Sequence, residues 1–427
     1  MKLQLSGGVN LQSGQNLNDL MKSNRKFSSI SENLFLTGEN LGEFLKAKGI
    51  HIRRLNWTHS STNKFHDILK CVPNLEHLEI TRGRLAMTEK VSLANLKTLV
   101  LDLASQNILQ LIDDTSKLKE ITFFGGNGYN AENARFIIKC SNLQELSAPL
   151  SFTLEEIDQI QFRLKKLSIK TDGGSFDENL LSKFLSLHEN SLEDIRIKQP
   201  IPVPICNQIF TQFKHCRKLE LDGDNLPDEQ AFYLCLEPLS SVRELTIKSG
   251  IHKHRVAVAL LTLFPLLEVL RFESFKVQIW FSKFLKSIPR RDPNLLHLKI
   301  HEFSKSTSVH MLFKNLKSIE VDSVQWKEPW LNFVLSHRNL EKIVVKSLTA
   351  NLSNDDIQQV MQLPCLKYIE VGGEVKELKA FYEVVRKDFK NLCSIKFELL
   401  PARKKLTIDI PSERQSWNSE KYNSYFE

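Results

Sequence analysis

A short motif of the form LxxLxL returns along most of the chain. Leucine or a similar apolar residue occupies its first, fourth and sixth positions, as in Leu75-Glu-His-Leu78-Glu-Ile80. The motif occurs 15 times, beginning at Ile52, Leu75, Leu96, Leu118, Leu143, Leu164, Leu192, Cys216, Val242, Leu267, Leu295, Leu316, Leu340, Leu366 and Leu392. The mean step is about 24 residues, and single steps range from 21 to 28. Such regular spacing indicates a repeat architecture.

Each motif predicts a short strand with one buried face. Its fourth and sixth residues alternate with polar ones, which is the period of two of a half-buried β-strand. Amphipathic stretches between the motifs predict helices over residues 154–162, 178–187, 229–236, 280–288, 355–363 and 375–389. Thr153 with Glu156, and Ser353 with Asp356, predict capping boxes at two helix starts.

The spacing falls in the range of leucine-rich repeats, which carry one strand and often one helix each. We therefore predict an α/β leucine-rich-repeat solenoid, a horseshoe with a concave parallel β-sheet and helices on the convex side. We expect one array over residues 1–412, made of about 15–17 irregular repeats, and a polar, disordered tail over residues 413–427.

Composition narrows the class of protein. The chain carries 58 basic and 50 acidic residues, a mild excess without the clustered charge of a dedicated nucleic-acid binder. The seven cysteines form no CxxC pair and predict reduced thiols; Cys71, Cys140, Cys216 and Cys365 lie at predicted helix-to-strand corners. The chain shows neither an apolar signal core nor an apolar run long enough to span a bilayer. We expect a cytoplasmic and/or nuclear protein that binds neither nucleic acid nor membrane.

No arrangement of residues predicts catalysis. The Gly-Gly-Asn-Gly stretch over residues 125–128 lacks the frame of a phosphate-binding loop and predicts a turn. His252 and His254 are two residues apart beside cations, which is typical of a solvated loop rather than a metal site. We expect no enzyme activity, no cofactor and no metal. The proline-rich stretches 199–204 and 289–293 predict longer loops.

The phrases CVPNLEHLEI, CSNLQELSA and HCRKLEL resemble the cysteine-containing leucine-rich repeats of F-box proteins, in particular their insect-type members. The resemblance covers residues 1–412. It implies the substrate-recognition horseshoe of an SCF-type ubiquitin ligase, in which the F-box docks on a Skp-type adaptor. Residues 1–27 do not fit an F-box, so the adaptor is expected only if an F-box lies upstream. The alternative is a ubiquitin-independent scaffold, or an inhibitor resembling ribonuclease inhibitor.

The polar residues that alternate with the buried strand positions are the candidates for partner binding, because they line the concave sheet of a solenoid. Neighbouring strands lie about 4.8 Å apart, so cations of successive repeats predict a mixed but mainly basic patch of Lys166, Lys170, Arg196, Lys198, Lys218 and Lys248. Such a patch fits a protein partner or substrate that is acidic or phosphorylated. The same reasoning selects His297, Lys299, His301, Lys342 and Lys346. Asp194, Glu220 and Asp222 reduce the net positive charge of this patch. A requirement for solubility alone also explains polar residues on strand surfaces.

Overall fold

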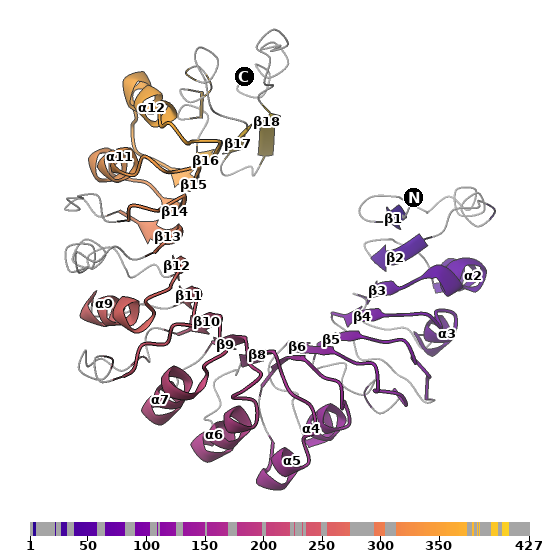
Figure 1. The fold of residues 1–427 in the computed structure, drawn as a ribbon. Helices are drawn as coiled ribbons and strands as arrows, with labels where there is room; N and C mark the ends of the chain where they lie inside the picture. Colours follow the sequence, from indigo (N-terminus) through magenta and orange to yellow (C-terminus); the bar gives the residue numbers. More distant parts are fainter. Residues whose placement is uncertain are drawn as a thin grey trace. The chain divides into compact units, whose positions relative to one another are not determined.

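Figure 1 shows a computed structural model of the chain. The chain divides into two compact units, Met1–Gln199 (unit 1) and Pro200–Glu427 (unit 2). The structure describes residues 3–5, 22, 27–31, 38–57, 65–81, 90–102, 109, 112–124, 131–149, 152–169, 177–198, 202–222, 226, 233, 236–248, 254–273, 294–303, 313–373, 378–379, 382, 384, 394–399 and 404–409.

Unit 1 is built on a parallel sheet, in which each strand pairs with the next from β1 to β9. The strands are β1 (Leu3–Leu5), β2 (Phe27–Ser31), β3 (Arg54–Trp57), β4 (His77–Ile80), β5 (Thr98–Asp102), β6 (Glu120–Phe124), β7 (Glu145–Ala148), β8 (Lys166–Ile169) and β9 (Asp194–Ile197). The helices α2 (Gly38–Lys48), α3 (Phe65–Lys70), α4 (Ala131–Ile138), α5 (Leu154–Asp158) and α6 (Glu178–Leu187) lie on one side of it, and a 3-10 turn, η1 (Gly49–His51), follows α2 (Figure 1).

Unit 2 repeats this plan. Its strands are β10 (Lys218–Leu221), β11 (Glu244–Ile247), β12 (Val269–Phe272), β13 (His297–Glu302), β14 (Ser318–Ser323), β15 (Lys342–Leu348), β16 (Tyr368–Gly373), β17 (Ser394–Leu399) and β18 (Lys404–Asp409). They pair in parallel from β10 to β17, whereas β18 pairs antiparallel with β17. Its helices are α7 (Val203–Gln212), α9 (His254–Leu263), α11 (Lys327–Ser336) and α12 (Asn354–Met361).

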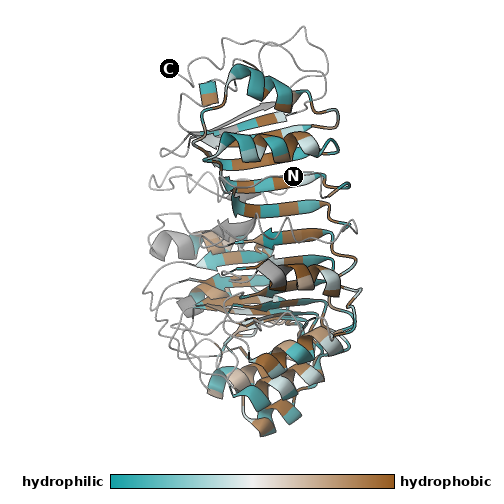
Figure 2. Ribbon diagram, turned by 90° about the vertical axis from the view of Figure 1, so that its left-hand side faces the viewer, coloured by the Kyte–Doolittle hydropathy of each residue, from teal (hydrophilic) through white to brown (hydrophobic). Residues whose placement is uncertain are grey.

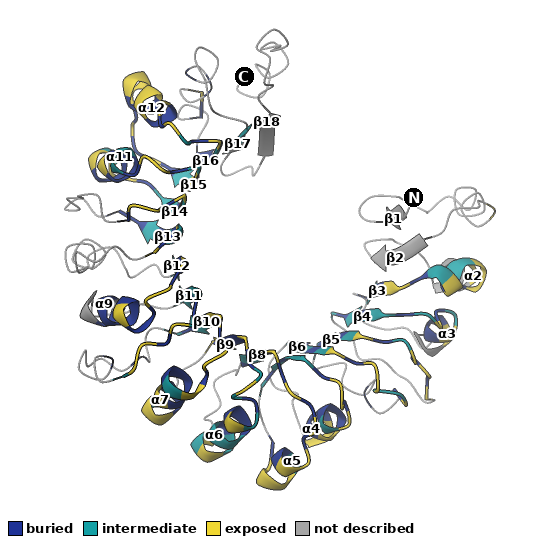
Figure 3. Ribbon diagram, viewed as in Figure 1, coloured by how far each residue is buried: buried dark blue, intermediate teal, exposed yellow. Residues whose placement is uncertain are grey.

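All 15 motif strands predicted from the sequence are present, as β3–β17, and the α/β solenoid is confirmed. The register joins equivalent motif positions, since Leu78 pairs with Leu99 and Leu99 with Ile121. All three side chains are fully buried, and burial of each contributes about 1.5–3 kcal/mol relative to exposure. Hydrophobic and hydrophilic residues therefore alternate along the strands (Figure 2), and the helices bury the side that faces the sheet (Figure 3).

Local sequence signals explain several helix boundaries. Helix α6 covers the predicted range, α5 ends earlier than predicted, and α12 is displaced by one or two residues. Both predicted capping boxes are present: the Thr153 hydroxyl accepts a hydrogen bond from the Glu156 N–H, and the Ser353 hydroxyl accepts one from the Asp356 N–H. Each cap satisfies backbone donors that the first turn of a helix leaves unpaired.

Two stretches predicted as loops begin helices instead. Helix α7 starts at Val203 inside the first proline-rich stretch, with Pro202 as its N-cap. Pro204 stands in the first helical turn, where the N–H that a proline lacks would have no partner within the helix. Helix α9 starts at His254, and its following residues Val256, Ala259 and Leu260 are buried. These residues form the apolar face of a helix that was not predicted from the sequence. Burial of this face explains why the stretch that contains His254 is helical rather than a loop.

Asparagine side chains tie neighbouring turns of unit 1 together. Asn74 Nδ2 donates to the Ile50 carbonyl oxygen at 2.9 Å, and Asn142 Nδ2 donates to the Ser116 carbonyl oxygen at 2.6 Å. Asn95 Nδ2 extends the series to Asn74 Oδ1 at 3.4 Å. The asparagines stand directly before the first leucine of their motifs, and Asn74 and Asn142 satisfy backbone carbonyls that precede β3 and β6.

Several predictions lie wholly or largely outside the described residues. They are the helices over 229–236, 280–288 and 375–389, the turn over 125–128, the proline-rich stretch 289–293 and the tail 413–427. Among the cysteines that the structure describes, Cys71, Cys140, Cys206, Cys216 and Cys365 form no disulfide. Burial raises the pKa of Cys140 and of Cys206 to about 12, so both remain protonated thiols.

Candidate functional site

The strand face of each unit consists of the side chains that alternate with buried strand residues. On β8, Leu167 and Ile169 are buried, whereas Lys166 is exposed and Ser168 half-buried. The parallel register places Lys166 opposite Asp194 of β9. Strand-face residues therefore form rows that run across the strands, one residue from each repeat.

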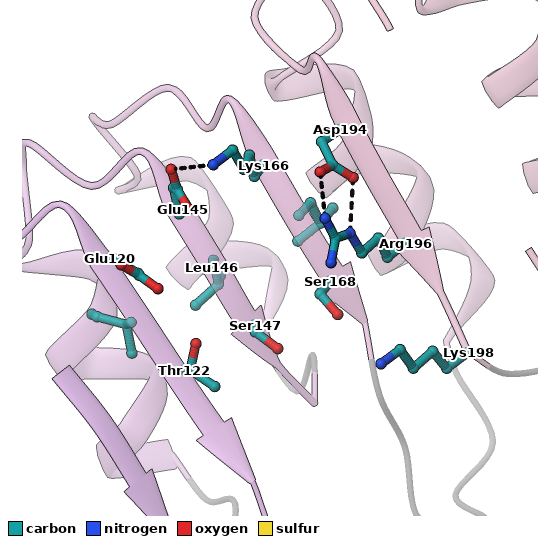
Figure 4. Close-up of a pocket in the computed structure, with 12 residues that line it drawn as sticks. Glu120, Thr122, Glu145, Leu146, Ser147, Lys166, Ser168, Asp194, Arg196 and Lys198 are labelled. Atoms are coloured by element: carbon teal, nitrogen blue, oxygen red, sulfur yellow. Dashed lines mark hydrogen bonds and ion pairs between the residues drawn. The ribbon is translucent and has the colours of Figure 1, made fainter. Parts of the chain in front are cut away.

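A hollow of about 290 Å³, the unit 1 hollow, lies on the unit 1 strand face across β6–β9 (Figure 4). Its central row is made of Thr122, Ser147 and Ser168, which the register aligns on β6, β7 and β8, and Arg196 continues the row on β9. The hollow is lined by Glu120, Ile121, Thr122, Glu145, Leu146, Ser147, Lys166, Leu167, Ser168, Asp194, Arg196 and Lys198. The hollow exists because short hydroxyl side chains alternate with longer charged ones.

Lys166, one of the predicted binding residues, is held by a carboxylate of the preceding repeat. Its Nζ lies 2.7 Å from Glu145 Oε1. The hydrogen bond from Lys166 to Glu145 raises the pKa of this lysine above its ordinary value. Glu145 occupies the same motif position one repeat earlier and Asp194 the same position one repeat later, so the motif position narrows the partner of Lys166 to these two carboxylates.

Arg196 makes a two-pronged contact with an acidic residue of its own strand. Its Nε lies 3.0 Å from Asp194 Oδ1, and its Nη2 lies 2.8 Å from Oδ2 (Figure 4). Asp194 is 5% exposed, and a buried carboxylate needs such a partner. The contact fixes the direction in which the guanidinium points.

The other predicted cations are distributed as follows. Lys198 is exposed and lines the unit 1 hollow, whereas Lys170 lies outside the described residues. Lys218 and Lys248 belong to unit 2, where Lys218 Nζ lies 2.8 Å from Glu244 Oε1 and Lys248 Nζ lies 2.7 Å from Glu220 Oε1.

The predicted surplus of positive charge is offset at these positions. Four of the predicted cations have a carboxylate within ion-pair distance, and the unit 1 hollow is lined by three cations and three carboxylates. The surface is therefore mixed rather than mainly basic.

A second hollow of about 390 Å³, the unit 2 hollow, lies on the unit 2 strand face across β12–β15. It is lined by Val269, Arg271, His297, Leu298, Lys299, Lys317, Ser318, Glu320, Glu341 and Lys342. His297, Lys299 and Lys342 are among the residues predicted from the sequence. Arg271, which occupies the same motif position as Lys299 one repeat earlier, lines the hollow but was not predicted.

His301 and Lys346, also selected from the sequence, join one ion-pair network outside that hollow. Lys346 Nζ lies 2.8 Å from Asp322 Oδ1 and 3.0 Å from Glu320 Oε1, and His301 Nδ1 lies 3.3 Å from Asp322 Oδ2. Burial lowers the pKa of Lys346, but the hydrogen bonds to Asp322 and Glu320 outweigh it and raise this pKa well above its ordinary value.

The described residues contain no group of three or more His, Cys, Asp or Glu side chains placed to hold a metal ion. Within the same residues, no helix is both long and apolar enough to cross a bilayer.

No protein-family model matches the sequence, and no curated protein matches it. Among solved structures, the chain is similar to TLR13 in complex with ssRNA13, at 13% identity and a TM-score of 0.49 over 82% of this chain and 58% of that one. It is also similar to two proteins of Listeria monocytogenes. The internalin InlF is 12% identical, with a TM-score of 0.30 over 88% of this chain and 93% of InlF. The functional domain of InlJ is 12% identical, with a TM-score of 0.29 over 77% of this chain and 76% of that domain.

The chain spans 58% of the TLR13 chain. At these identities the likeness concerns the fold alone. Its fold is that of the leucine-rich-repeat proteins. The motif register of β3–β17 carries this conclusion independently of the comparisons.

Proposed function

We propose that this chain is a protein-interaction scaffold that binds a protein partner on the unit 1 strand face. The observation that supports this proposal is the unit 1 hollow, where a row of hydroxyl groups is bordered by side chains held in ion pairs. Side chains that are already ordered lose little conformational entropy on binding. This role requires neither catalysis nor a cofactor.

The chemistry of the hollow favours a partner that carries charges of both signs. Lys166 and Arg196 stand beside Glu145 and Asp194, so positive and negative groups alternate across neighbouring positions. Complementary charge patterns select partners and fix their register more than they add affinity. An acidic or phosphorylated residue near Lys198, next to a basic residue near Glu120, matches this alternation.

We further propose that the scaffold is the substrate-recognition part of an F-box-type ubiquitin ligase receptor. Support comes from the resemblance of its cysteine-containing repeats to those of F-box proteins. Cys140 and Cys216 are buried thiols at helix-to-strand corners, and they fit a reducing cytoplasmic or nuclear environment. The alternative is a ubiquitin-independent scaffold or inhibitor, and residues 3–5 and 27–31, which belong to the repeat sheet, are compatible with either role.

Affinity capture from cell extract tests the binding role. The wild-type chain is compared with Lys198→Glu combined with Ser168→Glu, which adds negative charge to the hollow at two solvent-side positions. The matched control is Lys214→Glu combined with Ser186→Glu, which lies outside the hollow. We expect the hollow variant alone to lose the main captured protein, quantified by mass spectrometry. Equal capture by all three proteins would contradict the proposal.

The same captures separate the two finer roles. A Skp-type adaptor and a cullin that co-purify with the chain support the ligase role. A partner captured at the hollow without adaptor or cullin supports the ubiquitin-independent scaffold.

A further inference from the structure

The unit 2 hollow has a floor of small side chains between long ones. Val269, His297, Ser318 and Lys342 follow one another along a single row across β12–β15. Val269 and Ser318 have short side chains, so the surface is lower at these positions than at His297 and Lys342. The floor combines an apolar contact with a hydroxyl group, and it is open to a ligand from the strand face.

Cations predominate among the charged groups that line this hollow. Arg271, Lys299, Lys317 and Lys342 line it together with two carboxylates, Glu320 and Glu341. Two of the cations are engaged by carboxylates: Lys299 lies 3.0 Å from Glu273 and 3.5 Å from Glu320, and Lys317 lies 3.2 Å from Glu341.

The remaining two cations are less engaged. Arg271 meets Glu244 through Nη1 alone, at 3.4 Å, and its side chain is 38% exposed. Lys342 is exposed, and within the described part of the chain it has no carboxylate at ion-pair distance. Its ammonium group lies over the Tyr368 ring, 5.0 Å from the ring centroid. Arg271 and Lys342 stand on β12 and β15, with His297 and Ser318 on the strands between them.

The lowered pKa of His297 is consistent with a positive electrostatic potential in the hollow. Burial is the largest cause of the lower pKa, and the charges of Arg271 and Lys317 lower it further. The ring is therefore neutral near pH 7, and it retains one N–H that can donate a hydrogen bond. Glu244 and Glu268 act in the opposite direction but do not reverse the shift.

We propose that the unit 2 hollow binds an anionic side chain of a protein partner, a carboxylate or a phosphorylated hydroxyl. Arg271 and Lys342 supply charge-assisted hydrogen bonds from two sides, and the Ser318 hydroxyl and the His297 N–H donate from the floor. Val269 contacts the apolar part of the side chain. This inference rests on the proposed role as a protein-binding scaffold, and it assigns the chemical class of one partner group.

Fluorescence anisotropy with the full chain tests the assignment. Three labelled peptides share a glycine-rich sequence and differ at one central residue, which is phosphoserine, glutamate or serine. We expect saturable, salt-sensitive binding of at least one anionic peptide, and binding about tenfold weaker for the serine peptide. A preference for phosphoserine identifies phosphate as the ligand group, and a preference for glutamate identifies a carboxylate.

Variants locate the binding in the hollow. Lys342→Met should weaken binding of the anionic peptides about tenfold, since it removes one charge-assisted contact. The control Arg338→Met removes an exposed cation of the same unit, in the turn after α11, and should change binding less than about twofold. Ser318→Glu, which places a carboxylate on the floor, provides a second variant whose folding is checked by circular dichroism.

The proposal is overturned if no anionic peptide binds saturably, or if Lys342→Met and Ser318→Glu bind as the wild type does. Equal binding of all three peptides would also overturn it. The capture experiment at the unit 1 hollow distinguishes a failure of this inference from a failure of the proposed scaffold role. Peptide binding that fails while that capture remains hollow-dependent refutes this inference alone. Equal capture by the wild type and the unit 1 hollow variant, with peptide binding intact, refutes the binding role of unit 1 and leaves this inference standing.

Discussion

The backbone N–H of Leu164 donates a hydrogen bond to Nδ1 of His188, which lies one repeat later in the chain, at 3.4 Å. The imidazole stacks on Phe162 with a centroid distance of 5.6 Å and meets Phe184 edge-on at 4.8 Å. His188 is fully buried, and burial lowers its pKa from 6.5 to about 3. The ring is therefore neutral in the folded protein, as its acceptor role requires.

This depressed pKa predicts a loss of stability in acid. The unfolded chain binds a proton at His188 near pH 6.5, whereas the folded chain does so only near pH 3. The stabilising contribution is complete above pH 6.5 and is lost as the pH falls toward 3. At pH 5 the loss is on the order of 2 kcal/mol. Urea unfolding between pH 8 and pH 4.5 measures it.

Carboxylates also titrate in this range, so the variant His188→Gln serves as the reference. We expect its free energy of unfolding to fall less steeply with acid than that of the wild type. His337 must be considered in the same series, because it accepts a hydrogen bond from the Phe313 N–H in unit 2 and its pKa is also lowered by burial. Parallel pH curves for wild type and His188→Gln would refute the prediction.

Gly372 should not tolerate a side chain. A Cβ atom at this position would collide with the carbonyl oxygen of Lys346 on the adjacent strand β15. We expect Gly372→Ala to destabilise unit 2 by about 2 kcal/mol or more, because the backbone rather than a flexible side chain must move. Thermal unfolding compares it with Thr246→Ala, a solvent-side change on β11. Equal melting temperatures for both variants would contradict the close approach.

A charge at a buried strand position should unfold several repeats together. Leu167 is 1% exposed at the centre of β8, and an unpaired carboxylate there costs roughly 3–5 kcal/mol. Neighbouring repeats share the loss because each buries its core only against its neighbours. Hydrogen exchange should therefore show that Leu167→Asp, but not Ser168→Asp, exposes β7 and β9 as well as β8. Exchange restricted to β8 would count against this coupling.

Exchanging the partners of the Lys166–Glu145 ion pair separates folding from recognition. The double variant Lys166→Glu with Glu145→Lys retains the pair but reverses its direction on the strand face. An exposed pair contributes little to stability, about 0–1 kcal/mol, so we expect an unchanged melting temperature. Capture of the partner should fall severalfold, since charge pattern governs selectivity. Unchanged capture would move recognition away from this part of the surface.

Removal of residues 413–427 tests the proposed end of the repeat array. This segment is polar and contains no LxxLxL motif. We expect a chain that ends at residue 412 to keep its melting temperature within about 1 °C, because the removed residues supply no motif position to the core. A clear drop in melting temperature would extend the folded region beyond residue 412.

The strands could be predicted because one local rule determines them. Leu78 and Ile80 repeat their alternation in every later motif, and stacking equivalent positions is the only way to bury all of them at once. The helices were harder, because their signals vary between repeats. Pro202 and Pro204 indicated a loop until the buried Ile205 and Ile209 showed which face of α7 packs on the sheet.

The candidate residues could be placed on the strand face, but their surroundings could not. Whether Lys166 meets Glu145 or Asp194 depends on side-chain direction across neighbouring strands, and the sequence lacks that information. The hollows had no local signal either, since Ser147 and Ser318 form their floors only because longer neighbours stand around them. The strand register determines which exposed residues of successive repeats lie side by side on the strand face.

The ion pairs that join successive strands make each repeat dependent on its place in the series. Lys218, Glu244 and Arg271 stand on three consecutive strands, and the central carboxylate serves both cations. Deleting the repeat that carries Glu244 would leave the leucine spacing intact, but it would remove the carboxylate that lies between Lys218 and Arg271. Internal deletion or duplication of this repeat therefore also changes the ion pairs of its neighbours. The repeats share one backbone plan, but they are not interchangeable modules.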